Sequence, residues 1–167
     1  MKEVKVPEER VGVLIGEDGE TKEEFEDLTG CELGIEDNVV SVEGEPLEEM
    51  IAENIVKAIG RGFNPDKAFK LIEEGVNFHM IDIKQFADTQ KSRERLKGRV
   101  IGRDGEARRH IEKDANVDIS VYGSTVGFIG QPQNIEIARE AVRMLLQGSS
   151  HATAYQYLEK NQAKIKH

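Results

Sequence analysis

The chain has 167 residues and a formal net charge of −9, with 38% hydrophobic and 5% aromatic residues, which suits one ordinary globular domain or two small ones. No apolar run approaches the ~18 residues of a membrane span, we expect no signal peptide in the charged N-terminus, and a single cysteine excludes an internal disulfide framework and a cysteine-based zinc site. A pI near 5.1 argues against nucleic-acid binding unless the basic residues are concentrated in one place.

The charges are divided unevenly along the chain. Residues 1–77 carry 8 Lys and Arg against 21 Asp and Glu, a net of −13, whereas residues 78–167 carry 15 against 11, a net of +4. Within the second part, residues 91–113 hold 9 basic and 4 acidic residues, a net of +5. Such a block is as consistent with a solvated helix face as with a surface that binds a polyanion, so motifs must decide between the two.

The first third of the chain alternates between short strand and helix patterns. We expect a strand at 3–6, helices at 8–15 and 21–29, strands at 31–36 and 39–43, and a helix at 46–59. Gly30 is placed to end the second of these helices, and Pro46 to open the third. The helical spacing predicts that seven apolar residues face the core: Phe25, Leu28, Leu47, Met50, Ile51, Ile55 and Ile59.

The same order of elements follows in the second half. We expect a linking helix at 65–75, then a strand at 78–83, helices at 91–101 and 106–114, strands at 117–122 and 125–129, and a helix at 133–146. After a Gly-Ser-Ser break, residues 152–164 are expected to form a polar helix that carries Tyr155, Tyr157 and Leu158. Its small apolar face favours packing on the second half over a contact with RNA or a partner protein.

A Gly-x-x-Gly turn joins two short helices in each half. Gly16-Glu17-Asp18-Gly19 is followed, 86 residues later, by Gly102-Arg103-Asp104-Gly105. At this offset residues 12–59 align with 98–145 without a gap, and several spaced glycines and prolines coincide. We therefore interpret the chain as two copies of one β-α-α-β-β-α unit.

The turn suits the approach of a phosphate. Glycine accepts positive φ angles and has no side chain, so a bulky ligand can reach the backbone. The helix that begins at the turn presents unpaired N–H groups and the positive end of its dipole. A short Gly-x-x-Gly alone is equally typical of a tight turn between helices, and the surrounding pattern must distinguish the two.

That pattern resembles the KH-domain family. Residues 98–105 read Gly-Arg-Val-Ile-Gly-Arg-Asp-Gly and are followed by Ile111 and a strand at 117–121, which matches the family signature hydrophobic-Ile-Gly-x-x-Gly between two helices. The resemblance implies an α+β fold of two tandem eukaryote-type KH units, in which the turn clamps about four nucleotides of single-stranded nucleic acid. It divides the chain into a first KH unit (1–62), a linking helix (63–77), a second KH unit (78–148) and a C-terminal helix (149–167).

By this resemblance, RNA binds a groove of the second unit. Arg103 meets backbone phosphates from the turn, flanking arginines follow the same path, and strand residues form the opposite wall; the planar guanidinium suits phosphate oxygens. Asp104 departs from the usual small or basic turn residue, and it costs affinity beside a phosphate unless its side chain caps the next helix. The expected RNA-binding residues are Arg95, Gly98, Arg99, Val100, Ile101, Gly102, Arg103, Asp104, Gly105, Arg108, Arg109, Ile119 and Val121.

The first unit keeps the pattern and reverses the charge. Glu17 and Asp18 occupy its turn, and five further carboxylates follow by residue 27, opposed only by Lys22. We expect that this unit is not a standard RNA clamp. Acidic residues at a helix N-terminus complement the helix dipole, which explains part of the run but not its length. The alternative function is therefore a protein-interaction scaffold that uses the acidic first unit.

The combination of features is similar to a narrower family. Two KH units, an acidic first turn, a basic second turn and a tail reading Ser-His-Ala-Thr-Ala-Tyr at 150–155 look like the small archaeal ribosome-assembly KH proteins related to the eukaryotic partner of the Nob endonuclease. That resemblance implies a cytoplasmic protein whose second KH unit binds the 3′-end region of small-subunit ribosomal RNA. It implies the Nob endonuclease and the alpha subunit of initiation factor two as partners, and no membrane.

No catalytic pattern competes with this interpretation. The four histidines have no metal-ligand spacing, and neither a phosphate-binding G-x-x-x-x-G-K-[ST] loop nor a G-x-S-x-G nucleophile elbow is present. Cys31 begins a strand and is expected to be buried rather than nucleophilic. We expect a protein that is not an enzyme, with no catalytic residue, no metal and no cofactor.

Overall fold

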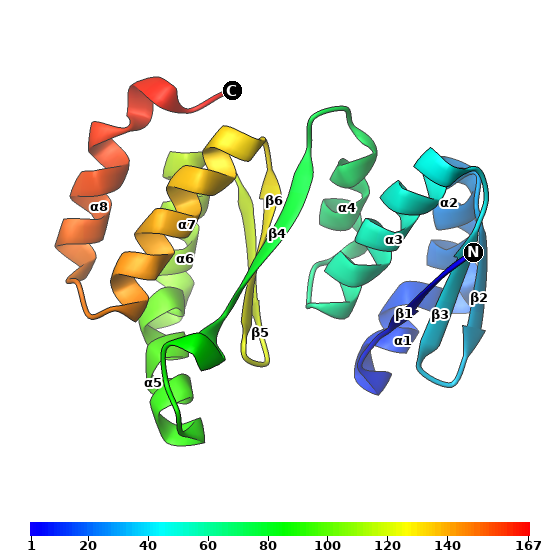
Figure 1. The fold of residues 1–167 in the computed structure, drawn as a ribbon, viewed down its shortest axis with the longest axis horizontal. Helices are drawn as coiled ribbons and strands as arrows, with labels where there is room; N and C mark the ends of the chain where they lie inside the picture. The colour runs from blue at the N-terminus through cyan, green and yellow to red at the C-terminus, as the bar shows by residue number, and fades with distance from the viewer. The chain divides into compact units, whose positions relative to one another are not determined.

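Two three-stranded antiparallel sheets organise the chain, one in each repeat (Figure 1). The computed structural model describes all residues 1–167, which form two units: unit 1 is Met1–Glu74 and unit 2 is Gly75–His167. In each unit the helices pack on one face of the sheet. No helix combines the length and the hydrophobicity needed to cross a bilayer. The expected α+β fold of two KH-type units is confirmed.

Unit 1 has the predicted order of elements. The elements are β1 (Lys2–Lys5), α1 (Glu8–Ile15), α2 (Glu20–Thr29), β2 (Glu32–Glu36), β3 (Val39–Glu43), α3 (Pro46–Gly60) and α4 (Pro65–Ala68), with 3₁₀ turns at Glu17–Gly19 and Phe69–Ile72. The sheet order is β1-β3-β2, and Val40 of the central strand lies opposite Val4 on one side and Ile35 on the other. Gly30 ends α2 with φ +74°, as predicted.

Unit 2 repeats this arrangement. The elements are β4 (Asn77–Asp82), α5 (Gln90–Ile101), α6 (Glu106–Ala115), β5 (Asp118–Tyr122), β6 (Thr125–Gly130), α7 (Pro132–Leu146) and α8 (His151–Lys160), with 3₁₀ turns at Ile83–Gln85, Arg103–Gly105 and Gln162–Lys164. The order β4-β6-β5 makes β5 an edge strand. Phe128 of the central strand is fully buried in the core.

Three of the predicted core residues of unit 1 lie in solvent instead. Leu28, Leu47 and Met50 expose 47%, 65% and 50% of their surface, so the expectation that they face the core is wrong. They stand at the end of α2 and in the first turns of α3, where helical spacing continues but no other element covers the helix. Phe25 and Ile55, nearer the middle of the same helices, are fully buried.

The repeat continues through the last helix of each unit. Asn64 and Ser150 stand 86 residues apart, and each accepts a backbone hydrogen bond as the N-cap of the next helix. Ala68 of α4 and Ala154 of α8 are fully buried at the same offset. Figure 1 shows α4 beside α3 and α8 beside α7. The expected linking helix is thus a short fourth helix of unit 1, and the repeating unit is β-α-α-β-β-α-α.

One arginine in each unit ties the first helix to the end of the third. Arg10 donates from Nε to Ile59 O (2.8 Å) and from Nη2 to Phe63 O (2.8 Å). Arg99 donates from Nε to Leu145 O (2.9 Å) and from Nη2 to the Ser149 carbonyl. The acceptors are equivalent in the repeat, but the donors are not, because Arg10 aligns with position 96. The same carbonyl groups are thus bound in both units, by arginines that stand one helical turn apart in the repeat.

Replacing Arg99 with glutamine is expected to destabilise unit 2 by about 2 kcal/mol, since two charge-assisted hydrogen bonds to partly buried carbonyls are lost. All three tyrosines belong to unit 2, so urea unfolding followed by tyrosine fluorescence reports this unit alone. Arg95→Gln, at an exposed position of α5, is the control and is expected to change stability by less than about 0.5 kcal/mol. Unchanged stability with weakened RNA binding in Arg99→Gln would instead make Arg99 an RNA contact.

Candidate nucleic-acid interface

The second Gly-x-x-Gly turn is built from left-handed backbone. Gly102 has φ 75° and ψ 175°, Asp104 has φ 55° and Gly105 has φ 77°. A Cβ atom on Gly102 would lie 2.6 Å from Ala107 Cβ and 2.7 Å from its backbone nitrogen, so only glycine fits where α5 meets α6. Gly102 N–H donates to Gly98 O (2.8 Å), which closes α5 at the turn.

Asp104 has a backbone role rather than a capping role. Gly105 is the N-cap residue of α6, and no side chain caps this helix. Aspartate is among the few non-glycine residues that tolerate positive φ, and Asp18 has the same φ of 55° in the first turn. The Glu106 N–H donates to Arg103 O, but no side chain caps the N–H groups that follow it in the first turn of α6, and the positive end of the helix dipole lies behind them.

Three arginine side chains surround this helix N-terminus. Arg103 is exposed in the turn itself. A Cβ atom on Gly105 would lie 2.8 Å from Arg109 Nη1 and 3.9 Å from Arg108 Nη2, so both guanidinium groups reach back over the turn. Arg103 and Arg109 make no ion pair, and their charge is free for a ligand.

Arg108 also belongs to a tie between α6 and β5. Its Nη1 lies 2.7 Å from Glu112 Oε1, and Glu112 Oε2 accepts the Ile119 backbone N–H at 2.9 Å. Unit 1 has the same tie, in which Lys22 pairs with Glu26 (3.7 Å) and Glu26 Oε2 accepts the Leu33 N–H at 2.9 Å. Since both units have it, the tie serves the fold, and it holds Arg108 beside the turn.

The remaining predicted site residues divide between surface and core. Gly98 is exposed on α5, and a Cβ atom there would have no neighbour within 4 Å. Ile101 and Val121 are half-buried, whereas Val100 and Ile119 are 0% and 4% exposed. The exposed members of the predicted site therefore run from Arg95 and Gly98 through the turn to Arg109. Val100 and Ile119 are buried beneath this surface. The guanidinium of Arg99 is engaged with the end of α7.

The turn of unit 1 has the same shape and the opposite charge. Gly16 has φ 77° and ψ 174°, and Gly19 has φ 76°, within a degree or two of Gly102 and Gly105. Glu17 stands where unit 2 has Arg103. The α2 surface next to the turn forms a shallow pocket lined by Glu20, Thr21, Glu23, Glu24 and Asp27. The two units thus share the backbone of the turn, but only the turn of unit 2 carries a cationic side chain, Arg103.

A family model described as a eukaryotic-type KH domain (KH-domain type I) matches residues 5–75 and again residues 77–163. This chain belongs to the KH-domain family. Each match includes the fourth helix of its unit, in agreement with the longer repeat.

Relatives of this KH protein are found in archaea and eukaryotes. A KH domain-containing protein of Methanocaldococcus jannaschii is 46% identical over 98% of this chain and 74% of the relative. A pre-rRNA-processing protein, pno1, of Emericella nidulans is 30% identical over 68% of this chain and 45% of its own length. The chain thus matches less than half of that fungal protein.

Solved structures of similar KH proteins cover almost the whole chain. Dim2p of Pyrococcus horikoshii has a TM-score of 0.90 and 40% identity, covering 95% of this chain and 98% of that one. A chain from a crystal structure of an a/eIF2α–aDim2p–rRNA complex of the same organism has a TM-score of 0.92 and 38% identity, covering 98% of this chain and 94% of that one.

Helix α8 of this KH protein packs on unit 2. His110 of α6 stacks on Tyr155 with ring centroids 3.7 Å apart, and His151 Nε2 lies 2.8 Å from Arg99 O. Leu158 is fully buried in the core. Burial raises the pKa of the Tyr155 hydroxyl, and the nearby Glu106 carboxylate adds to the effect. The packing interpretation of the C-terminal helix is confirmed, and His110 is engaged in that packing.

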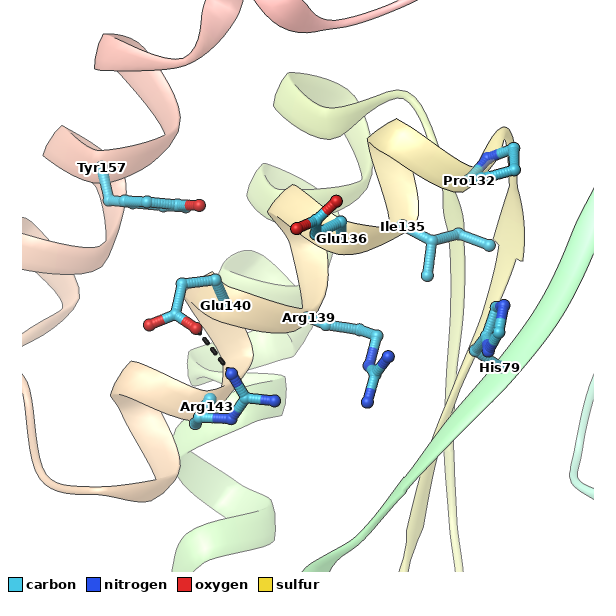
Figure 2. Close-up of a pocket in the computed structure, with 8 residues that line it drawn as sticks. All are labelled: His79, Pro132, Ile135, Glu136, Arg139, Glu140, Arg143 and Tyr157. Atoms are coloured by element: carbon cyan, nitrogen blue, oxygen red, sulfur yellow. Dashed lines mark hydrogen bonds and ion pairs between the residues drawn. The ribbon is translucent and has the colours of Figure 1, made fainter.

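A pocket of about 650 Å³ lies between α7, β4 and α8, and it includes none of the turn residues. Figure 2 shows Arg139 pointing from α7 toward the strand that carries His79, while Arg143 pairs with Glu140 (2.7 Å). The Arg139 Nε atom is buried without a partner. Burial raises the pKa of Tyr157, helped by the carboxylates of Glu140 and Glu136. Because both charge signs line this pocket, it is a weaker polyanion surface than the turn.

Other chemistries have little support in the side chains. No cluster of three or more His, Cys, Asp or Glu residues is placed to hold a metal ion. Cys31 is 2% exposed, and burial raises the pKa of its thiol, which keeps it protonated and unreactive.

Proposed function

We propose that this KH protein binds single-stranded RNA through unit 2 and acts in small-subunit ribosome assembly, on the 3′-end region of the small-subunit ribosomal RNA. The observation that carries the proposal is the second turn, where the uncapped first turn of α6 lies beside the exposed Arg103 and beside the Arg109 guanidinium that reaches over Gly105. The pre-rRNA-processing relatives and the rRNA in the complex of the Pyrococcus protein support the ribosomal assignment.

The geometry suggests how the groove works. A phosphate at the N-terminus of α6 is held by backbone N–H groups and by Arg103, with Arg108 and Arg109 beside it. The open surface at Gly98 lets the sugar-phosphate chain approach α5 closely. Splayed bases then pack against the half-buried aliphatic side chains of Ile101 and Val121, while the turn clamps the backbone of the unpaired nucleotides. Such a protein binds and positions RNA and performs no reaction of its own.

The partner proteins follow from the same reasoning. The a/eIF2α in the complex of the Pyrococcus protein supports the alpha subunit of initiation factor two as a partner of this chain. The resemblance to the ribosome-assembly KH proteins supports the Nob endonuclease as a second protein partner. A cytoplasmic location follows from this role.

A second candidate function is a protein-interaction scaffold based on unit 1. The observation that favours it is the pairing of an unchanged turn backbone with Glu17, Asp18 and the acidic α2 pocket, which would repel a polyanion and attract a basic protein surface.

Salt dependence and strandedness are expected to separate the two functions. A labelled single-stranded RNA from the 3′ end of small-subunit rRNA should bind with a log–log salt slope of about −2, because a clamp of about three phosphates contributes ~0.7 each. A duplex of the same sequence should bind at least about 10-fold more weakly, since paired bases cannot enter the groove. Fluorescence anisotropy at several salt concentrations measures both quantities. Equal affinity for the two RNAs would leave only a general charge effect, and no RNA binding would favour the scaffold.

A further inference from the structure

The exposed apolar side chains of unit 1 gather where α2 ends and α3 begins. Leu28 is the last residue but one of α2, and Leu47 and Met50 lie in the first turns of α3. The two helices meet there, because a Cβ atom on Gly30 would lie 3.5 Å from Glu48 Oε2. We call Leu28, Leu47 and Met50 the apolar cluster. Large side chains in solvent at one junction are a feature of interaction sites.

The equivalent junction of unit 2 is covered by the C-terminal segment of the chain, residues 161–166. Gln162 Nε2 donates to Asp114 O (2.8 Å), at the position equivalent to Leu28. Asn134, equivalent to Glu48, donates to Lys166 O and accepts from Lys166 N–H, both at 2.8 Å. Between these anchors Ile165 is buried in the core of unit 2. An extended segment with one aliphatic side chain therefore docks on this junction.

Unit 1 has no segment of its own to place there. The residues equivalent to 161–166 are 75–80, and they leave unit 1 to form β4, which pairs with β6. His79 stands at the position equivalent to Ile165. No segment of unit 1 therefore covers its own junction, whereas the equivalent junction of unit 2 holds an extended segment.

The residues around the two junctions differ in a consistent direction. Where unit 1 has Leu28, Leu47 and Met50, unit 2 has Asp114, Gln133 and Glu136. The exposed rim of the unit 1 junction is acidic, and its carboxylates make no ion pair with a lysine or arginine. The rim consists of Glu24, Asp27, Glu45 and Glu48. The equivalent residues of unit 2 are His110, Lys113, Gln131 and Asn134. An apolar centre with an acidic rim selects an aliphatic side chain flanked by cations.

We propose that the apolar cluster is a docking site for an extended segment of a partner protein, in which a large aliphatic residue is flanked by lysine or arginine. The chain contains a segment of this kind, because Ile165 stands between Lys164 and Lys166 on the junction of unit 2. The site lies in unit 1, whereas the proposed RNA groove lies in unit 2, and it would give unit 1 an apolar binding site in addition to its acidic turn.

The test uses the full chain and a labelled synthetic peptide with the sequence of residues 161–167, Asn-Gln-Ala-Lys-Ile-Lys-His. The variant is Leu28→Asp with Leu47→Gln and Met50→Glu, in which each new residue is the one that unit 2 carries at the equivalent place. We expect fluorescence anisotropy to show at least about 10-fold weaker binding of the peptide to this variant. A peptide with Ile165→Ser should bind the unaltered protein at least about 10-fold more weakly, and high salt should weaken the original complex.

Three readouts keep the outcomes distinct. Protection of the buried Cys31 thiol from a thiol reagent shows that unit 1 of the variant is folded, and unchanged affinity for single-stranded RNA shows that unit 2 is intact. Equal peptide binding by the variant, or equal binding of the Ile and Ser peptides, would overturn the proposal. A concentration-dependent dimer of the unaltered protein that the variant abolishes would assign the junction to a second copy of the chain and would also overturn it.

Discussion

Replacing Arg103 with glutamate is expected to weaken the binding of single-stranded RNA by about 100-fold. The change removes one charge-assisted hydrogen bond to phosphate, worth about 1.5–3 kcal/mol, and adds a repelling charge, while each 1.4 kcal/mol corresponds to a factor of ten in affinity. The fold should be unaffected, because the variant turn reads as the first turn does, and that turn has the same backbone angles with Glu17 in place. Anisotropy titration with a 3′-end rRNA fragment measures the loss.

Two matched variants make this result specific. Lys160→Glu makes the same charge change on an exposed residue of α8, and it is expected to weaken binding less than about threefold. Glu17→Ala combined with Asp18→Ala removes the acidic charges from the first turn and should change affinity little if unit 2 alone clamps the RNA. If Lys160→Glu weakened RNA affinity as much as Arg103→Glu, binding would depend on the overall charge of the protein rather than on the turn. A large loss in the Glu17/Asp18 variant would make unit 1 a contributor.

Much of the fold was predictable because the same pattern of turns and elements occurs twice in the sequence. Glycines and prolines at a fixed offset located the turns and helix starts in both copies, so Gly30 and Pro46 delimit the helices as expected. Hydrophobic spacing then gave the type of each element. The opposite charges of the two turns were also predictable, since the side chains of an exposed turn have few neighbouring groups that could neutralise them.

What escaped prediction depends on contacts between distant elements. The resemblance places Arg99 beside the RNA path, and the sequence alone gives no sign that its guanidinium also donates to the carbonyls of Leu145 and Ser149, 46 and 50 residues away. The alignment of the repeats could not reveal this role, since Arg10 performs it from a different position. Leu28 and Leu47 were expected in the core because spacing does not show which part of a helix its neighbours cover. Comparison of the two junctions supplies that information, since the C-terminal segment covers the junction of unit 2 and no segment of unit 1 covers its own.

Gly102→Ala is expected to destabilise unit 2 by about 3 kcal/mol or more. With φ 75° and ψ 175°, Gly102 has a conformation that is essentially reserved for glycine, which costs other residues about 1–3 kcal/mol. The added Cβ would also lie 2.7 Å from the Ala107 backbone nitrogen, so α6 has to move away from α5. That movement should disrupt the proposed phosphate site, so RNA binding should be lost together with stability. Urea unfolding followed by tyrosine fluorescence measures the effect on unit 2, while the Cys31 thiol of unit 1 should stay protected.

Gly98→Ala, one turn earlier in the same helix, is the control with the opposite sign. Its Cβ would meet nothing within 4 Å, and alanine is favoured over glycine inside a helix, so stability should rise by up to about 1 kcal/mol. If the sugar-phosphate chain passes over this surface, RNA affinity should nevertheless fall several-fold. A stabilised Gly98→Ala protein with unchanged affinity would place the RNA elsewhere on α5. A stable Gly102→Ala protein would show that α5 and α6 can separate at little cost, contrary to the tight turn geometry.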